Sequence, residues 1–379
     1  MAEVYITRAA KFLPNDPVSN DEMENYLGLV NNAASRAKRI VLRNNGIKTR
    51  YYAFDQSGAS THTNAQLTAK AIEGLYGEGF GPEDMELLSC GTSSPDTLMP
   101  SHTVLVHGFL QNRNLEVNCA SGNCCAGMNA LKFGYLSVKS DGTRNAVCAG
   151  SERTSSWMLA DKFNAEIENL EKLEEQPILS FKKDFLRFML SDGAGAFLLE
   201  NQPRGPLSLK IEWMEGYSYA HELETCMYAG GEKQEDGNVK PWSEYEPKEW
   251  LNQSLFAIKQ DTRLLDQHIL EKGAESLKLA IDKHHLASSE IDYFLPHVSS
   301  HYFVSGLAKS LEEKGAPILP EKWFMNLARV GNVGAGSIYL MLEELLASGR
   351  LKAGEKILLS VPESARFTYS YALLTVVSV

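Results

Sequence analysis

Short apolar runs alternate along the chain with longer segments in which apolar residues recur every three or four positions. The apolar runs predict buried strands at residues 145–152, 195–200, 355–363 and 371–376. The periodic segments predict helices at residues 61–76 and 247–285, and Pro247 suits the first position of the second helix. Strands that alternate with helices indicate βαβ units and mostly parallel sheets.

The two halves of the chain carry a weak internal repeat. A polar helix exit, a short apolar strand and a turn occur at residues 81–94 and again at residues 287–300. We therefore expect an α/β protein with duplicated βαβ halves, residues 1–205 and residues 206–379, and two mixed, mostly parallel sheets between helix layers.

Two segments have no counterpart in the repeat. Residues 154–188 are helical in pattern and mixed in charge, and residues 215–250 are acidic, aromatic and rich in Gly and Pro. Long excursions from a compact domain usually serve as lids, caps or partner surfaces. We expect the first segment to form a cap insertion over a substrate tunnel or a dimer interface, with a solvated surface helix as the alternative.

Composition excludes several classes of protein. The 379 residues carry a net charge of −11 without a block of Lys and Arg, so a nucleic acid partner is not expected. No apolar run is long enough to span a bilayer, and the N-terminus lacks a signal-peptide pattern, so a cytoplasmic location is expected. The six cysteines form no Cys-x-x-Cys pattern, which argues against a disulfide framework and a metal site.

One cysteine-rich turn is a candidate nucleophile site. Cys125 follows a predicted strand and opens a helix that carries small residues. A helix N-terminus favours thiolate over thiol, and its backbone N–H groups can hold an oxyanion. Considered alone, this pattern also fits a small-residue helix that is packed in the core.

A histidine and an asparagine occupy matching places in the second half. His297 follows Pro296 at a predicted strand end, where α/β folds often carry functional groups, and His301 is a nearby decoy. Asn332 lies in a glycine-rich turn before a helix, at the repeat position of the cysteine turn. Its amide can donate to a carbonyl, or it can serve only as a turn residue.

The motifs together resemble β-ketoacyl-acyl-carrier-protein synthase III, nearly end to end. The matching motifs are Cys125-Ala126-Gly127, Ser191-Asp192-Gly193-Ala194-Gly195-Ala196, Leu295-Pro296-His297 and Gly331-Asn332. The resemblance implies a thiolase-like five-layer αβαβα fold and a Claisen condensation of acyl thioesters. It implies catalytic roles for Cys125, His297 and Asn332, with an oxyanion hole formed by the backbone N–H groups of Cys125 and Arg366.

The resemblance also implies substrates and partners. No cofactor is expected, since acyl thioesters on the phosphopantetheine of an acyl carrier protein or of coenzyme A are the substrates. Arg39 replaces a tryptophan that stacks on coenzyme A in the family, which favours the carrier protein. Arg43 is expected to meet the nucleotide or carrier, and Met99 to gate the tunnel of the partner in a homodimer. Cys119 opens a second motif and remains an alternative nucleophile.

The branch of the family and the reaction leave alternatives. The sequence is closer in character to ketosynthases that build dialkylresorcinols and flexirubin-type lipids than to the housekeeping enzyme. The alternatives are an acyltransferase of the same fold that forms an ester or amide, and a non-catalytic partner subunit of another ketosynthase. A partner subunit would typically lack the cysteine, which this chain retains.

Overall fold

The central feature of the computed structural model is a mixed sheet. The structure describes residues 2–32, 34–35, 37–162 and 185–378. Nine strands form this sheet in the order β13 (Tyr293–Pro296), β14 (Lys356–Glu363), β15 (Thr368–Val377), β8 (Ser208–Ser218), β1 (Tyr5–Phe12), β7 (Gly193–Glu200), β6 (Asn145–Glu152), β4 (Leu87–Thr92) and β5 (Glu116–Ser121). The strands predicted from the four apolar runs correspond to β6, β7, β14 and β15.

Two groups of strands meet at a short junction. Strand β1 pairs with β7 over most of its length but reaches β8 only through Tyr5 opposite Lys210 and Ile6 opposite Leu209. The expected pair of sheets is therefore present as two groups of strands that this junction joins into one continuous sheet. The expectation of mostly parallel pairing is wrong. In this sheet the pairs β13–β14, β4–β5 and β4–β6 are parallel and the other five described pairs are antiparallel, because β7 and β15 return beside β6 and β14.

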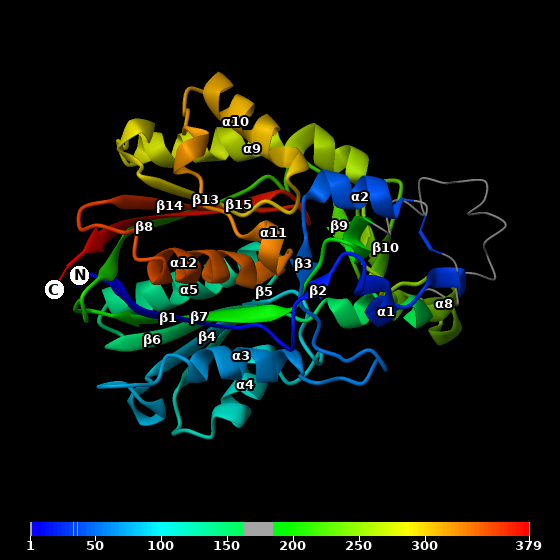
Figure 1. Ribbon diagram of the computed structural model, residues 1–379, viewed down its shortest axis with the longest axis horizontal. Coiled ribbons are helices and arrows are strands. Elements are labelled where there is room, and N and C mark those ends of the chain that lie inside the picture. Colours follow the sequence, from blue (N-terminus) through cyan, green and yellow to red (C-terminus); the bar gives the residue numbers. More distant parts are fainter. Residues whose placement is uncertain (1, 33, 36, 163–184, 379) are drawn as a thin grey trace.

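Helices cover and separate the two groups, as Figure 1 shows. The helices that form the three layers are α9 (Thr262–Lys283) and α10 (Tyr302–Glu313) on one outer face, α5 (Cys125–Lys139) and α12 (Ser337–Ala347) in the middle, and α3 (Asn64–Glu73) and α4 (His102–Leu110) on the other outer face. This is the expected αβαβα arrangement, and α3 is the helix predicted at residues 61–76.

The strand order is nearly the same in the two halves. The order β1-β7-β6-β4 in the first half corresponds to β8-β15-β14-β13 in the second. Among the described residues, the second half has no strand that corresponds to β5, but a bridge between Trp323 and Phe294 occupies the corresponding edge. We propose that the halves divide at residues 205 and 206, in the loop between β7 and β8.

Small residues allow the middle layer to pack closely. A Cβ atom at Gly127 of α5 would lie 2.2 Å from the carbonyl oxygen of Ala335, and one at Gly150 of β6 would lie 2.3 Å from the same atom. Tyr339 of α12 donates to the carbonyl oxygen of Gly127 at 2.8 Å and stacks on Phe197 at 4.3 Å. The glycine of the cysteine turn is therefore required by the contact between the two halves.

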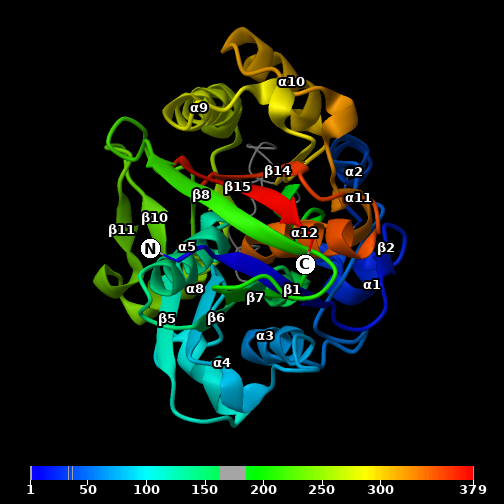
Figure 2. The same cartoon turned by 90° about the vertical axis from the view of Figure 1, so that its left-hand side faces the viewer.

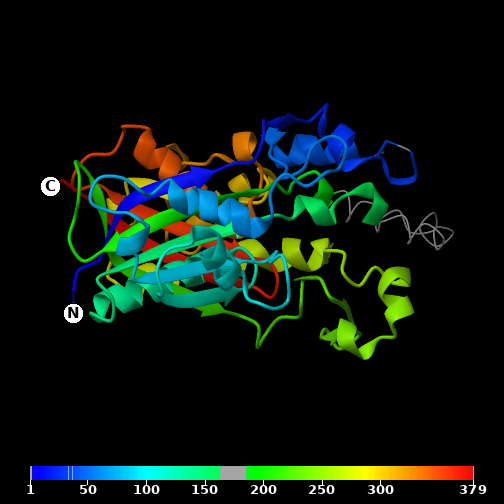
Figure 3. The ribbon, with the colours of Figure 1, turned by 90° about the horizontal axis from the view of Figure 1, so that it is seen from below.

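Short elements gather at one end of the molecule. They are β2 (Val18–Ser19), α1 (Met23–Leu27), α2 (Lys38–Asn45), β3 (Thr49–Arg50), β9 (Met227–Tyr228), β10 (Gly231–Lys233), β11 (Val239–Pro241), α8 (Pro247–Asn252), β12 (Lys259–Gln260) and α11 (Leu327–Val330). Figure 3 shows the segment with α8 projecting beyond the sheets. The proposed cap at residues 154–188 lies largely outside the described residues.

The prediction of one helix over residues 247–285 is wrong. The segment forms α8, a loop, and then α9. Ser254 has a positive φ of 46°, which a helix does not allow. The carboxylate of Asp261 accepts the backbone N–H groups of Arg263 and Leu264, so a new helix begins there. Pro247 does occupy the first turn of α8, as predicted.

Candidate active site

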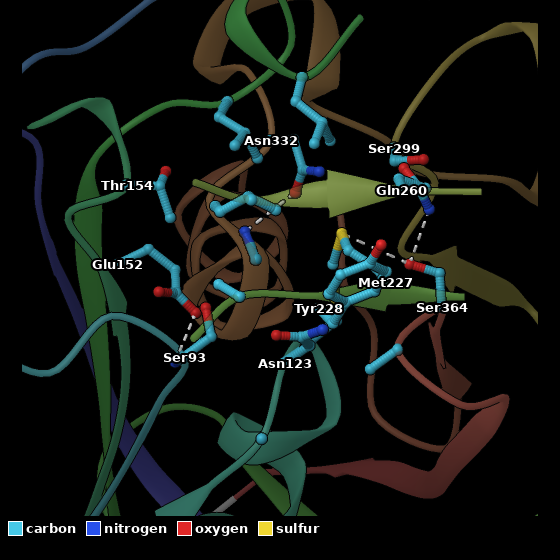
Figure 4. A pocket seen from close by; sticks show the side chains of 18 of the residues that line it. Ser93, Asn123, Glu152, Thr154, Met227, Tyr228, Gln260, Ser299, Asn332 and Ser364 are labelled. Carbon is cyan, nitrogen blue, oxygen red and sulfur yellow. Dashed lines mark hydrogen bonds between the residues drawn. The ribbon is translucent and has the colours of Figure 1, made fainter. Parts of the chain in front are cut away.

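A cavity of about 1080 Å³ opens where the two groups of strands meet the short elements. Cys124, His297 and Asn332 all line it, together with Glu152 and Ser364. Figure 4 shows Asn332 on one side of the cavity, Glu152 with Ser93 on a second, and Gln260 with Ser364 on a third. The cavity thus brings together a thiol, an imidazole and a carboxamide from distant parts of the chain.

The side chain of Asn332 has a fixed orientation. Its backbone N–H donates to the carbonyl oxygen of Met189 at 3.0 Å, and its own carbonyl oxygen accepts the backbone N–H of Ser191 at 2.9 Å. Its side-chain oxygen accepts the backbone N–H of Gly334 at 2.9 Å. Because the oxygen is held inside the turn, the Nδ2 group is available to donate to a ligand in the cavity.

His297 lies where β13 ends, as the sequence predicts. Its backbone N–H donates to Ser360 of β14 at 2.8 Å, which continues the parallel pairing of β13 with β14. The imidazole is buried, and its Nε2 atom has no hydrogen-bond partner among the described residues. Burial lowers the pKa of His297 to about 4, so the ring is neutral near pH 7.

The structure corrects the expected position of the thiol. Cys125 is buried behind the cavity wall, and its Sγ atom lies 3.3 Å from the carbonyl oxygen of Val361 and 3.7 Å from that of Thr368. The half-buried neighbour Cys124, at the N-cap of α5, lines the cavity. Successive residues of a helix point about 100° apart, so a shift of one residue turns the side chain from the cavity into the core.

The other expected site residues lie elsewhere. Cys119 is exposed on β5, at the edge of the sheet. Arg43 is exposed on α2, and Met99 is 86% exposed in the loop that follows β4. None of the three lines the cavity, although Leu98 beside Met99 does.

The two residues expected to form the oxyanion hole, Cys125 and Arg366, are not among the residues that line the cavity. The backbone N–H of Cys125 already donates to a carboxylate oxygen of Glu363, at 3.0 Å. Arg366 lies outside the lining of the cavity, and its Nε atom donates to the carbonyl oxygen of Leu223 at 3.0 Å. Ser364 and Ala365, the two residues before Arg366 in the same turn, do line the cavity.

The surroundings of Cys124 favour the thiol. Burial raises its pKa, and the carboxylates of Glu363 and Glu152 raise it further. The expectation that the helix N-terminus would favour a thiolate at Cys125 is not met either, because burial and the charge of Glu363 raise the pKa of that thiol as well.

Sequence reasoning missed Glu152, which lies at the end of β6. Its carboxylate accepts the backbone N–H groups of Ser93 at 3.0 Å and Ala335 at 3.2 Å, and the hydroxyl of Ser94 at 2.5 Å. Burial raises its pKa. A glutamate that ends an otherwise apolar run was the available signal, since a buried carboxylate needs several donors.

One arm of the cavity is an apolar channel between the outer helices and the sheet. The side chains that form it are Leu265, Ile269 and Leu277 of α9, Phe303, Leu307 and Leu311 of α10, and Phe294, Tyr369 and Tyr371 of the sheet. Leu265 and Leu277 are twelve residues apart on one helix, which corresponds to about 18 Å. Gly273 lies between them and leaves space beside Tyr369.

A second arm is lined by aromatic rings of the short elements. Trp242 packs against Trp250 with ring centroids 5.2 Å apart, and both rings contact Phe256. All three line the cavity. Among the described residues, no group of three or more His, Cys, Asp or Glu side chains could hold a metal ion, and none of the helices is long and apolar enough to cross a membrane.

Sequence comparisons find relatives of the chain along most of its length. Residues 281–371 match the family model for the C-terminal region of 3-oxoacyl-[acyl-carrier-protein] synthase III. The chain is 25% identical to a β-ketoacyl-[acyl-carrier-protein] synthase III of Chlorobaculum tepidum, over 93% of this chain and 94% of the relative. It is 23% identical to the enzyme of the same name from Koribacter versatilis, over 97% and 96%.

Solved structures share the fold over nearly the whole chain. OleA of Xanthomonas campestris, as a His-to-Ala variant, aligns with a TM-score of 0.73 at 20% identity, covering 98% of both chains. AbyA1, a tetronic acid condensing enzyme, aligns with a TM-score of 0.72 at 21% identity, covering 98% of this chain and 99% of its own. The 3-oxoacyl-[acyl-carrier-protein] synthase III of Aquifex aeolicus aligns with a TM-score of 0.69 at 20% identity, covering 98% of this chain and 99% of its own.

The protein has the thiolase-like fold of the condensing enzymes. The sequence similarities relate the chain to β-ketoacyl-[acyl-carrier-protein] synthase III enzymes, which are acyltransferases.

Proposed function

We propose that this protein catalyses a Claisen condensation of two acyl thioesters through an acyl-cysteine intermediate on Cys124. The observation that carries the proposal is that Cys124, His297 and Asn332 line one cavity with an apolar channel. A cysteine-to-serine variant of OleA has been solved with lauric acid and lauroyl-CoA bound, which supports an acyl occupant for a channel of this kind.

The first half-reaction loads the enzyme. The sulfur of Cys124 attacks the carbonyl carbon of an acyl thioester, the carrier thiol leaves with the proton, and the acyl chain enters the apolar channel. Because the resting surroundings favour the thiol, the proton must leave Cys124 as the bond forms.

The second half-reaction forms the carbon–carbon bond. A thioester that bears a β-carboxylate binds beside the acyl-cysteine and loses CO2, and its carbonyl becomes an enolate. Nε2 of His297, as the protonated nitrogen of the neutral ring, and Nδ2 of Asn332 donate to the enolate oxygen. The carbanion attacks the acyl-cysteine, and the Cys124 thiol is regenerated.

For the substrate, we propose the dialkylresorcinol branch of lipid biosynthesis, with a β-ketoacyl donor and an unsaturated acyl partner that close to a cyclohexanedione. A β-ketoacyl donor has no β-carboxylate, so in this branch its enolate forms when the carbon between its two carbonyls loses a proton to water, in place of CO2. The two apolar arms of the cavity support a reaction that accommodates two chains. The phosphopantetheine arm of an acyl carrier protein is the proposed donor, with coenzyme A as the alternative, and a homodimer is the proposed assembly.

Mass spectrometry tests the attacking atom directly. The full chain is incubated with acyl-pantetheine and acyl-carrier thioesters of several chain lengths and is then digested. We expect the acyl mass on Cys124 in the wild-type protein and in Cys125→Ser, and no acyl mass in Cys124→Ala. Acylation of Cys125 or Cys119, or of no cysteine, contradicts the proposal.

A further inference from the structure

Glu363, in the second half of the chain, forms hydrogen bonds with the turn at residues 122–125 in the first half. It is the last residue of β14 and is 8% exposed. A single oxygen, Oε2, accepts the backbone N–H of Asn123 at 3.0 Å and that of Cys125 at 3.0 Å. The two donors flank Cys124, so one carboxylate spans the residue that faces the cavity.

The carboxylate has little other support. Its second oxygen lies 3.5 Å from the hydroxyl of Thr368, which pairs with Glu363 across β14 and β15. No salt bridge to it is found in the described part of the chain. The N–H groups at the start of α5 therefore balance most of its charge, which makes these bonds strong.

We propose that Glu363 is a positioning residue that holds the turn at residues 122–125 so that Cys124 points into the cavity. The inference rests on Cys124 being the nucleophile, as proposed above. The side chain has to reach across the contact between the halves, and two N–H groups that could otherwise bind an oxyanion are committed to the turn.

The charge of Glu363 has a second effect, on the thiol itself. The titratable groups that act on Cys124 in the described structure are Glu363, Glu152 and the neighbouring Cys125, and His297 lines the same cavity. Glu363 is the larger of the two carboxylate contributions that raise the pKa of Cys124. A residue that only stabilised the fold at a distance would not change the ionisation of that thiol.

Three substitutions of Glu363 separate the effect of its side-chain length from the effect of its charge. Glu363→Gln keeps an oxygen that can accept both N–H groups but removes the charge. Glu363→Asp keeps the charge but shortens the side chain, and Glu363→Ala removes both. Each variant is measured for its melting temperature, for condensation of octanoyl-pantetheine with malonyl-pantetheine, and for the pH dependence of Cys124 alkylation by iodoacetamide, followed by peptide mass.

We expect the condensation rate to fall about 100-fold in Glu363→Ala and Glu363→Asp, because a misplaced nucleophile loses that much. In Glu363→Gln we expect a condensation rate within about tenfold of the wild-type rate, because the amide oxygen can still accept both N–H groups and hold the turn. The pH at which Cys124 is alkylated should fall in Glu363→Gln and Glu363→Ala, which lack the negative charge. It should remain at the wild-type value in Glu363→Asp, which keeps the charge.

Two results overturn the inference. One is a wild-type condensation rate in Glu363→Ala or Glu363→Asp, and the other is an alkylation curve in Glu363→Gln that coincides with that of the wild type. If Glu363→Ala does not fold, the comparison of Gln with Asp decides the question. Failure of the proposed function is seen separately, as the absence of an acyl group on Cys124 in the wild-type protein.

Discussion

The side-chain oxygen of Asn332 accepts the backbone N–H of Gly334 at 2.9 Å, two residues further along the same turn. The bond determines which end of the carboxamide faces the cavity, since the oxygen is occupied and the NH2 group is left to donate. The orientation therefore supports a role in which Asn332 stabilises developing negative charge on a substrate oxygen.

Asn332→Asp should abolish condensation while leaving the first half-reaction. The aspartate keeps the oxygen that bonds to Gly334 and loses the donor, so we expect condensation to fall by about 10²–10³-fold. Acylation of Cys124, measured by intact mass, should persist. A variant that still makes the full amount of product would instead favour acyl transfer to an alcohol or amine, the alternative in which no enolate forms.

His297 should make the stability of the protein depend on pH. The group has a folded pKa of about 4, below the value of about 6.5 in the unfolded chain, so the unfolded state binds more protons between these values. Stability should therefore be complete above pH 6.5 and fall as the pH drops towards 4, with a slope of up to about 1.4 kcal/mol per pH unit from this group.

Urea unfolding at several pH values measures this slope, and His297→Asn should flatten it. His102 provides a matched control, since burial also lowers its pKa to about 4 but its Nε2 atom lies 3.2 Å from Thr68 and Ser151, away from the cavity. His102→Asn should flatten the slope as well, while folded protein retains condensation. An unchanged slope in His297→Asn would show that the imidazole is already protonated or exposed.

Much of the fold could be predicted from local pattern. Short apolar runs predicted β6 and β14 because a strand buried on both faces has no polar alternation. The joined helix at residues 247–285 was an error, because both α8 and α9 have helical periodicity and the break at Ser254 depends on backbone conformation.

The sequence predicted which types of residue line the candidate site, but it did not predict which of the neighbouring cysteines faces the cavity. His297 and Asn332 lie at a strand end and in a glycine turn, which local motifs identify. The choice between Cys124 and Cys125 depends on where α5 begins, to within one residue, and motif matching does not resolve that. Glu363 could not be found from sequence, since its partners are about 240 residues away and are backbone atoms.

The apolar channel should set the preferred length of the acyl chain. Leu307 is half-buried on α10 and lines the channel. Leu307→Trp should fill part of it, so kcat/KM for long acyl-pantetheines should fall about fourfold for each methylene that is displaced, while short ones are unaffected. Leu279→Trp, on the exposed side of α9, is the control. Equal losses for short and long chains would argue against this channel as the acyl site.

The basic face of α2 should dock the acidic carrier. Arg39 and Arg43 are one turn apart and exposed, at the end of the molecule that carries β9 and β10, as Figure 1 shows. Arg43→Glu should lower kcat/KM for a carrier-bound acyl thioester about tenfold at low salt and less at high salt. The same variant should act normally on the pantetheine thioester. Equal effects on both substrates would assign Arg43 to the pocket instead of the carrier surface.

The free edge of β5 should join two copies of the chain. Figure 2 shows β5 beside α4 and α5 at the edge of the sheet. Apolar side chains are exposed on these three elements, at Val117, Phe109, Phe133 and Leu136. An open strand edge with apolar neighbours favours pairing with a second strand. Val117→Lys with Leu136→Lys should shift the protein from dimer to monomer in sedimentation equilibrium, whereas Leu319→Lys, an exposed position far along the chain, should not. A wild-type protein that sediments as a monomer at micromolar concentration would rule out this interface.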